Sequence, residues 1–333
     1  MPSSQKPDGL PQYSDVTAAA ERLSGHARVT PLLQSNLLNE RLGGRLLVKP
    51  EMLQRTGSFK FRGAFNRVSR IHKNVRGAGV VAYSSGNHAQ GVAAAARLLG
   101  MPALIVMPRD APEIKIASTR AHGAEIVFYD RLTENREEIG ECLAADRGAT
   151  LVRPYDDPYV IAGQGTVGLE LAAQAREAGV RLDAVLLPCG GGGLTAGSAL
   201  ALAEECPETE LYGVEPAGFD DTARSLAAGE RRTNDARARS ICDALQMPSP
   251  GEMTFAINVR LLTGGLVVDD DAAAAAMATA FSHFKVVAEP SGAVALAAML
   301  EGIFPIKGKT VAVVCSGGNV DAQAFRAALD RPG

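Results

Sequence analysis

The sequence lacks several features that would place it in a specialised class of protein. None of its five cysteines lies within four residues of another, so the spacings of a zinc site or a redox dithiol are missing. No apolar stretch reaches the roughly 18 residues of a membrane helix, and the first residues lack the basic and apolar segments of a secretory leader. We therefore expect a cytoplasmic protein with reduced, mostly buried cysteines, namely Cys142, Cys189, Cys206, Cys242 and Cys315.

A cluster of like charges is also missing. The formal net charge is −3, and no run of lysine or arginine stands out. A face that binds nucleic acid or an anionic membrane would need such a basic cluster. We therefore expect a small-molecule partner, and neither nucleic acid nor a membrane.

What the sequence does contain is a regular alternation of short apolar runs and alanine-rich segments. Most runs are continuously apolar, as expected for strands that are covered on both faces. The nine predicted strands cover residues 46–48, 80–83, 103–107, 125–128, 151–152, 185–187, 211–214, 266–268 and 311–314. The predicted helices include residues 91–99, 165–178, 194–205, 272–284 and 293–300. This alternation predicts an α/β fold with parallel sheets and crossover helices.

Nine strands can form one wide sheet or two smaller ones. The pattern is interrupted at Arg153–Pro158, a segment with two prolines and two aspartates, where we place a boundary. We predict two open twisted parallel-sheet domains, a large one of residues 1–75 and 158–333 and a small one of residues 76–157. Residues 1–13 are predicted to form a disordered tail. About one helix follows the last strand, so we expect no appended regulatory domain.

Ligands bind at the carboxyl ends of strands in open parallel sheets, so polar clusters after apolar runs are candidate sites. Ser84–His88 follows the run at 80–83 and precedes a predicted helix. Its backbone N–H groups would lie at a helix N-terminus, which favours an anion such as a carboxylate. The same residues could equally form an ordinary helix cap with a turn glycine.

Four consecutive glycines occupy positions 190–193, after another apolar run. A tight turn needs one or two of them, whereas a phosphate approached by several backbone N–H groups explains all four. We therefore favour a phosphate site over a plain turn. The phosphate itself stays open, because Gly191, Gly193 and Ala196 fit a relaxed dinucleotide pattern and Glu215 ends the next strand, where a ribose-binding acid would lie.

Two further segments could contribute chemistry. Ser316–Asn319 follows the last run, and its serine could hydrogen-bond a ring nitrogen or cap the final helix. Thr56–Ala64 places Lys60 and Arg62 beside aromatic residues near a helix start, although a surface helix with snorkelling basic residues is the plain alternative. A lysine amine at a phosphate site can form an imine with pyridoxal phosphate, and a dinucleotide enzyme does not need this lysine.

Together these motifs resemble those of the fold-type II pyridoxal-phosphate enzymes, which are tryptophan-synthase-β-like in fold, and within them the serine/threonine dehydratase (threonine ammonia-lyase) and serine racemase family. The resemblance rests on Ser58–Ala64, Ser84–His88, the four glycines and Ser316–Asn319, which follow the family's order and spacing. The segments at 161–166 and 289–293 also resemble the family. This resemblance implies a pyridoxal 5'-phosphate cofactor and a homodimer.

The resemblance also implies roles for single residues. Lys60 would hold the cofactor as a Schiff base and remove the substrate Cα proton, and Ser85 would be the second catalytic residue. Residues implied to bind the cofactor are Phe59, Lys60, Asn87, Gly190, Gly191, Gly192, Gly193, Leu194 and Ser316. Those implied to surround the substrate carboxylate are Ser84, Ser85, Asn87 and His88. Because a neutral hydroxyl at Ser316 cannot keep the ring nitrogen protonated, the implied chemistry is elimination rather than transamination.

A structural metal site is a further expectation. Glu215 and Asp221 lie six residues apart, and hard divalent cations prefer such oxygens. Members of the resembled family hold Mg or Ca with the equivalents of Glu215, the Phe219 carbonyl and Asp221. Alternatively, Asp220 or Asp221 caps a helix that begins at Thr222, and Glu215 is simply exposed.

The implied reaction is dehydration and deamination of L-serine or L-threonine to a 2-oxo acid and ammonia. Ser85 keeps serine racemisation open, because serine racemases carry a serine here that can protonate Cα from the face opposite the lysine. Dehydration of another 3-hydroxy amino acid, such as hydroxyaspartate or phenylserine, is a further alternative, and an NAD-dependent dehydrogenase is a remote one. The side-chain preference depends on loops such as Ile241–Leu245, which the sequence does not orient.

Overall fold

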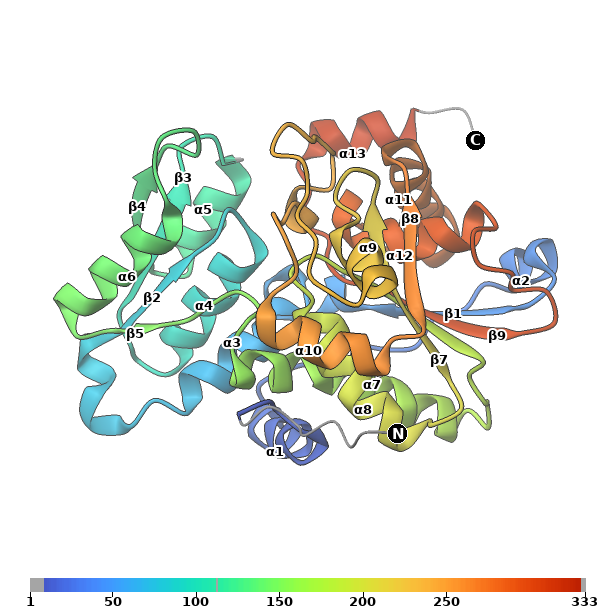
Figure 1. Cartoon of the computed structure of the whole chain (residues 1–333), viewed down its shortest axis with the longest axis horizontal. Coiled ribbons are helices and arrows are strands. Elements are labelled where there is room, and N and C mark those ends of the chain that lie inside the picture. The colour runs from blue at the N-terminus through green and yellow to red at the C-terminus, as the bar shows by residue number, and fades with distance from the viewer. Residues whose placement is uncertain (1–8, 112, 331–333) are drawn as a thin grey trace.

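The computed structural model describes residues 9–111 and 113–330 of the 333-residue chain. Its strands are β1 (Arg45–Pro50), β2 (Val80–Tyr83), β3 (Ala103–Pro108), β4 (Glu125–Tyr129), β5 (Thr150–Leu151), β6 (Ala184–Pro188), β7 (Glu210–Pro216), β8 (Gly264–Val268) and β9 (Thr310–Cys315). Each of the nine overlaps a predicted run, with ends that differ by at most two residues. They form two parallel sheets, and Figure 1 shows helices packed around both. The predicted α/β class with two parallel sheets is therefore confirmed.

The helices connect and cover these strands. The α-helices are α1 (Tyr13–Leu23), α2 (Asn36–Leu42), α3 (Lys60–Ser69), α4 (Asn87–Leu98), α5 (Glu113–Ala121), α6 (Arg136–Arg147), α7 (Pro158–Glu177), α8 (Gly193–Glu205), α9 (Asp221–Ala228), α10 (Glu252–Leu261), α11 (Asp270–Phe284), α12 (Pro290–Leu300) and α13 (Ala322–Leu329). Short 3-10 helices cover Glu51–Leu53, Arg55–Gly57, Lys73–Ala78 and Asp243–Leu245. In the described ranges, no helix combines the length and the apolar character needed to cross a bilayer.

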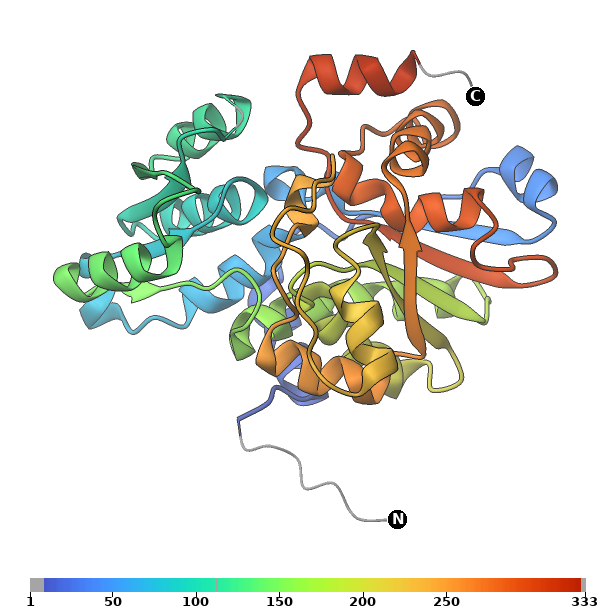
Figure 2. The same ribbon diagram turned by 45° about the horizontal axis from the view of Figure 1, so that its top comes forward.

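The larger sheet has five strands in the order β1-β9-β6-β7-β8. Neighbouring strands are parallel, and Arg45 at the start of β1 is in register with Thr310 at the start of β9. Leu186 and Val313 pack on one face with α11 and α12, whereas Leu187 and Val314 pack on the other with α7 and α8. Figure 2 shows the helices lying on both sides of this sheet. Burial of both faces explains why these strands read as continuous apolar runs.

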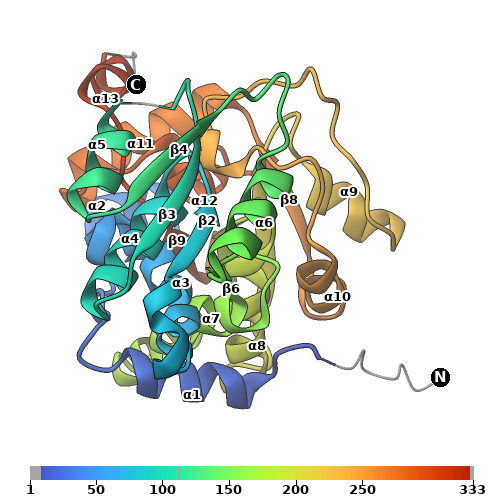
Figure 3. The ribbon, with the colours of Figure 1, turned by 90° about the vertical axis from the view of Figure 1, so that its left-hand side faces the viewer.

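The smaller sheet has four strands in the order β4-β3-β2-β5. Helices α4 and α5 lie on one face and α6 on the other, as Figure 3 shows from the side. We call these four strands with α4, α5 and α6 the small unit, and the five-stranded sheet with its helices the large unit. The small sheet lies between Val80 and Leu151, inside the range 76–157 predicted for the small domain, and the boundaries of the two domains stay a prediction.

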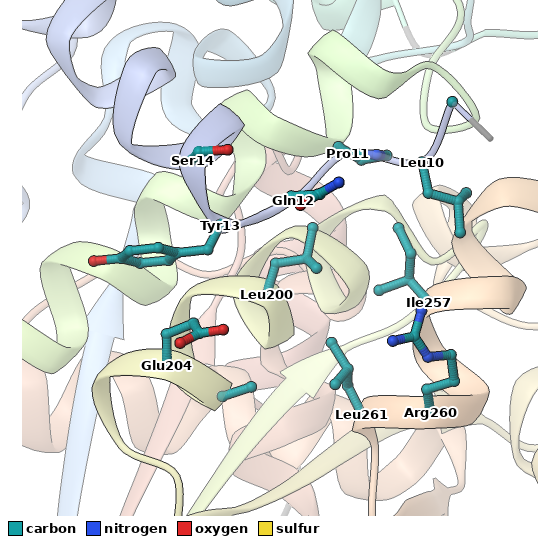
Figure 4. Close-up of a pocket in the computed structure, with 12 residues that line it drawn as sticks. Leu10, Pro11, Gln12, Tyr13, Ser14, Leu200, Glu204, Ile257, Arg260 and Leu261 are labelled. Carbon is teal, nitrogen blue, oxygen red and sulfur yellow. The ribbon is translucent and has the colours of Figure 1, made fainter. Parts of the chain in front are cut away.

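Residues 10–13 differ from the predicted disordered tail. Leu10 packs against a cluster that includes Ile257, and Tyr13 begins α1 and hydrogen-bonds Glu205 through its hydroxyl. Figure 4 shows this segment across a pocket whose far side includes Leu200 and Ile257. Removing these apolar side chains from water stabilises the packed segment. Residues 1–8 of the predicted tail lie outside the described residues.

Candidate active site

The three predicted strand-end clusters lie at one cleft. The glycines at 190–193 follow β6 and Ser316 follows β9, and these two strands are neighbours in the large sheet. Ser84–His88 follows β2 of the small unit and faces the same cleft. The cleft consists of two adjoining cavities, which share Lys60, Asn87, Tyr155, Gly191 and Ala244. Every residue predicted to bind cofactor or substrate lines at least one of them, although the individual roles stay predictions.

Backbone pairing brings the lysine motif to the end of β9. Ser58 forms an antiparallel bridge with Gly317, and the backbone N–H of Phe59 donates to the Ser316 carbonyl at 3.1 Å. Lys60 then begins α3, as the sequence predicts. These backbone contacts hold the segment that carries Lys60 beside the end of β9. As a result, Lys60 and Ser316 line the same cavity.

Helix α3 is anchored by a largely buried ion-pair network that no motif in the sequence indicates. Arg62, which is 1% exposed, donates to both oxygens of Glu51 at 2.8 Å and to Glu170 of α7 at 2.6 Å. Lys49 of β1 pairs with the same Glu170 at 2.7 Å, and Thr30 donates to Glu51 at 2.6 Å. The network contains two cations and two carboxylates, so its net charge is zero. The network fixes the helix start that carries Lys60 relative to β1 and α7.

The half-buried Lys60 lines both cavities of the cleft. Its Nζ donates to the Pro154 carbonyl at 2.8 Å and lies 5.1 Å from the centre of the Phe59 ring. Burial lowers the pKa of Lys60 to about 8, because the charged ammonium loses its hydration. A large fraction of the amines is therefore neutral near pH 8, and the neutral amine is the nucleophilic form.

The four glycines form a cradle that side chains would fill. A Cβ at Gly191 would overlap the ring of Tyr155, and one at Gly190 would lie 3.2 Å from the Leu245 Cα. Gly192 has a φ of +87° and leads directly into α8, whose first turn opens on the cavity. Backbone N–H groups at such a helix start bind phosphate well. The amine, the cradle and the Ser316 hydroxyl together fit pyridoxal phosphate.

The loop after β2 offers backbone donors to a carboxylate. Helix α4 begins at Asn87, and the Ser84 hydroxyl accepts from the Gly86 N–H at 3.1 Å. His88 Nε2 donates to the Val152 carbonyl at 2.9 Å, and burial together with the nearby Lys60 charge lowers the pKa of His88 to about 3. The ring is therefore neutral, and its other nitrogen has only an acceptor role. His88 can contribute its backbone N–H at the helix start rather than a ring N–H.

Asn87 is held between two side chains of the large unit. Its amide nitrogen donates to Glu289, and its amide oxygen accepts from the Asn319 side chain at 2.7 Å. This pairing links the motif Ser84–His88 to the motif Ser316–Asn319. The family resemblance implies a cofactor contact for Asn87, whereas nothing in the sequence indicates Glu289 as its neighbour.

Several cleft residues have no signal in the sequence. Tyr155, Arg136 and Lys115 line the cavities, yet each lies in a segment without a recognisable ligand motif. Asp243 belongs to the loop Ile241–Leu245, which was expected to contribute to the substrate pocket and whose Ala244 also lines it. Tyr155, Arg136 and Lys115 reach the cleft only through the tertiary fold, so their spacing in the sequence does not reveal them.

The predicted metal ligands lie together after β7. Glu215 is buried, and its carboxylate accepts from the backbone N–H groups of Thr222 and Ala223, so it caps α9 rather than being exposed. Asp221 Oδ2 is buried and has no hydrogen-bond partner among the described residues. Burial raises the pKa of both carboxyl groups. Within the described part of the chain, no group of three or more His, Cys, Asp or Glu side chains could hold a metal, so the site stays a prediction.

Comparison with known proteins agrees with this geometry. The family described as "Pyridoxal-phosphate dependent enzyme" matches residues 23–317. An L-threo-3-hydroxyaspartate ammonia-lyase from Pseudomonas sp is 47% identical over 96% of this chain and 99% of its own length. The Schizosaccharomyces pombe serine racemase is 39% identical, over 95% and 96%.

Solved structures give the same result. The threonine deaminase from T.th. has a TM-score of 0.87 at 47% identity and covers 93% of this chain and 99% of its own. Maize serine racemase has a TM-score of 0.89 at 35% identity, over 96% and 97%. These matches decide against the NAD-dependent dehydrogenase. The chain therefore belongs to the pyridoxal-phosphate dependent enzymes, with PLP as its cofactor.

Proposed function

We propose that the chain catalyses β-elimination of water from a small 3-hydroxy amino acid, which yields a 2-oxo acid and ammonia. This proposal rests mainly on the half-buried Lys60, which shares one cavity with the glycine cradle and the other with Ser84–His88. Its lowered pKa makes it a competent base near neutral pH. The neutral Ser316 hydroxyl in the same cavity supports elimination over transamination.

Each group in the cleft has a separate role in the proposed reaction. Pyridoxal phosphate, when bound, supplies a sink for the negative charge that develops at the substrate Cα. Backbone N–H groups at the start of α4 hold the substrate carboxylate, and Lys60 takes the Cα proton. Loss of hydroxide from Cβ completes the removal of one water. The released enamine becomes an imine and adds water, which gives the 2-oxo acid and ammonia.

We further propose 3-hydroxyaspartate as the preferred substrate. Arg136 lines the cavity together with Lys60 and Ser85, and its guanidinium lies 5.6 Å from the centre of the Tyr83 ring. No carboxylate pairs with Arg136 among the described residues, so it can accept a second carboxylate from the substrate. The relatives named L-threo-3-hydroxyaspartate ammonia-lyase, at 47% and 43% identity, support this choice over L-serine and L-threonine.

A substrate screen tests the proposal. The purified holoenzyme is incubated with L-threo-3-hydroxyaspartate, L-serine and L-threonine, and both ammonia and 2-oxo acid are measured. We expect equal amounts of the two products, with the highest kcat/KM for 3-hydroxyaspartate. Transamination without release of ammonia would contradict elimination, and a preference for threonine would contradict the substrate proposal alone.

Serine racemisation is the second candidate function, favoured by one residue. The half-buried Ser85 lines the cavity that contains Lys60, so its hydroxyl can deliver a proton to a planar Cα. Chiral analysis of serine after incubation measures this activity. Replacement Ser85→Ala is expected to remove racemisation and leave elimination.

We also propose that the chain works in the cytoplasm as a homodimer. All five cysteines are free, and Cys189, Cys242 and Cys315 are buried, which suits a reducing compartment. The homodimer rests on the resemblance to the family. Light scattering of the purified holoenzyme measures its mass, and a single-chain mass would contradict the dimer.

A further inference from the structure

Two small-unit residues reach across to the large unit beside the predicted cofactor site. Asn87 of α4 donates to Glu289 and accepts from Asn319. Lys115 of α5 pairs with Asp243 at 2.5 Å, and its Nζ lies 3.8 Å from Glu289 Oε2. Glu289 is therefore contacted by both small-unit side chains.

Glu289 itself does not contact the cleft. It is 1% exposed, and it lines neither of the two cavities, so it has no direct contact with a ligand there. Its Oε2 has no hydrogen-bond partner among the described residues. A buried carboxylate costs free energy unless charge and hydrogen bonds compensate it. An apolar residue would fill this buried position at a lower cost in free energy, so the presence of a carboxylate at Glu289 needs an explanation.

The orientation of the Asn87 amide provides that explanation. A carboxylate only accepts, so the nitrogen of the Asn87 amide must face Glu289. The Asn319 amide nitrogen donates both to Asn87 Oδ1 and to the Thr56 carbonyl at 2.8 Å, so the oxygen of Asn87 must face Asn319. Both neighbours therefore specify the same amide orientation. One N–H of Asn87, whose side chain lines both cavities, remains free of these two contacts.

Two motif glycines make room for this arrangement. A Cβ at Gly317 would overlap Glu289 Oε1 and lie 3.2 Å from the Asn87 nitrogen. A Cβ at Gly86 would lie 2.9 Å from Lys115 Cδ. Glycine at both positions is therefore explained by the passage of the Glu289 and Lys115 side chains, independently of any ligand.

We infer that Glu289 is a positioning residue, which fixes the side-chain amide of Asn87 for cofactor binding, with Lys115 as its charge partner. The inference rests on the proposed contact between Asn87 and pyridoxal phosphate. It adds that this contact depends on a residue that the cofactor does not touch.

The charges around Glu289 agree with this role. Burial raises the pKa of Glu289, the Lys115 charge opposes that rise, and Asp243 adds to it. A protonated carboxyl group could also donate a hydrogen bond, so it could pair with either the oxygen or the nitrogen of the Asn87 amide. Lys115 therefore favours the ionised form, which specifies the amide orientation.

Two variants of similar shape separate the hydrogen bond from the packing. Glu289→Gln keeps an acceptor oxygen for Asn87, whereas Glu289→Met keeps the length but has no comparable acceptor. The dissociation constant of pyridoxal phosphate is measured by visible absorbance on titrating the cofactor-free protein. We expect it to rise about tenfold in Glu289→Met, the effect of one lost hydrogen bond between buried groups, and less than about threefold in Glu289→Gln.

Asp183→Ala serves as a control for general destabilisation. Asp183 accepts from the Thr310 N–H at 2.7 Å at the amino ends of β6 and β9, away from the cleft. Its loss is expected to lower the urea midpoint without changing the affinity for pyridoxal phosphate. If Glu289→Met does not fold, as judged by circular dichroism, Glu289→Ala replaces it with the same expectation.

A double-mutant cycle distinguishes failure of the inference from failure of the site. Asn87→Ala should weaken cofactor binding, and adding Glu289→Met to it should have no further effect, because both changes remove one interaction. An unchanged affinity in Asn87→Ala would overturn the proposed role of Asn87. A normal affinity in Glu289→Met, or effects of the two changes that simply add, would overturn the role of Glu289.

Discussion

At the scale of single residues, the lowered pKa of Lys60 predicts how the protein takes up its cofactor. Only a neutral amine attacks the aldehyde of pyridoxal phosphate. With the pKa at about 8, half of the Lys60 amines are neutral at pH 8, whereas a solvent-exposed lysine of pKa 10.5 would be about 0.3% neutral. The rate of cofactor uptake should therefore rise with pH and level off above about pH 8.

Stopped-flow absorbance of the cofactor-free protein between pH 6 and pH 10 measures this rate. Lys60→Ala is the control and should show no fixed chromophore after borohydride treatment. A rate that still rises steeply between pH 9 and pH 10 would mean that Lys60 is hydrated and has an ordinary pKa.

Arg136 leads to a prediction about substrate preference. Replacement Arg136→Gln removes the charge that we propose for the second carboxylate of 3-hydroxyaspartate. Hydrogen bonds between charged groups are worth about 1.5–3 kcal/mol, so kcat/KM for this substrate should fall about 10- to 100-fold. The value for L-serine, which has no second carboxylate, should change less than about threefold.

Arg147→Gln is the matched control for that variant. Arg147 ends the same helix α6, is exposed, and pairs with Glu125 at 2.9 Å away from the cavities. It should leave both substrates unaffected. An equal loss for serine and hydroxyaspartate in Arg136→Gln would show that the arginine supports the fold and does not select the substrate.

Residues of the site could be predicted from the sequence where they belong to a recognisable motif, and several of these motifs directly follow a strand. Lys60, the glycines at 190–193 and Ser316 are of this kind, because residue type and position both signal a ligand. Glu289 could not be assigned its contact with Asn87, which lies 202 residues away along the chain. This contact depends on how the small unit packs against the large unit, and no short stretch of sequence indicates that packing.

At the scale of elements, strands were easier to predict than helices. The strands are short apolar runs, and burial on both faces leaves them few polar residues. Helix α6 escaped prediction because it is largely charged and only Gly140 and Ala144 are buried. Helix α7 begins at Pro158 rather than near residue 165, because Asp157 caps it and proline suits its first turn. The loop assigned to a domain boundary therefore contains a helix start.

The ion-pair network around α3 leads to a prediction about stability. Arg62→Met leaves the buried Glu51 without its cation, and breaking a buried pair in this way costs about 3–5 kcal/mol. Arg67→Met on the same helix removes a more exposed pair with Asp157, which should cost about 1 kcal/mol or less. Urea unfolding measures both. Similar costs for the two variants would show that the network does not anchor the helix.

The loop between β7 and α9 leads to a prediction about metal binding. If Glu215, the Phe219 carbonyl and Asp221 hold a cation, excess EDTA should lower the melting temperature and Mg²⁺ or Ca²⁺ should restore it. At a hundredfold excess over its dissociation constant, the cation would contribute about 2.7 kcal/mol. Asp221→Asn should remove the response, whereas Asp220→Asn, which alters a carboxylate paired with Arg224, should keep it. A melting temperature that EDTA and added cations leave unchanged would exclude the site.

At the scale of the whole molecule, the sequence predicted two parallel sheets but not the order of their strands. The neighbours β1 and β9 are separated by most of the chain, and nothing in Arg45–Pro50 indicates its partner. The cleft depends on this order, because β6 and β9 must be adjacent for the glycines and Ser316 to share a cavity.

The strand order also determines when the site can exist during protein synthesis. All four strands of the small sheet lie between residues 80 and 151, so that sheet can form soon after this stretch leaves the ribosome. Strand β1 is made earlier, yet its neighbour in the large sheet is β9, which ends at Cys315. The nascent chain therefore carries Lys60 long before it has a pocket, and capture of the cofactor is one of the last events of its folding.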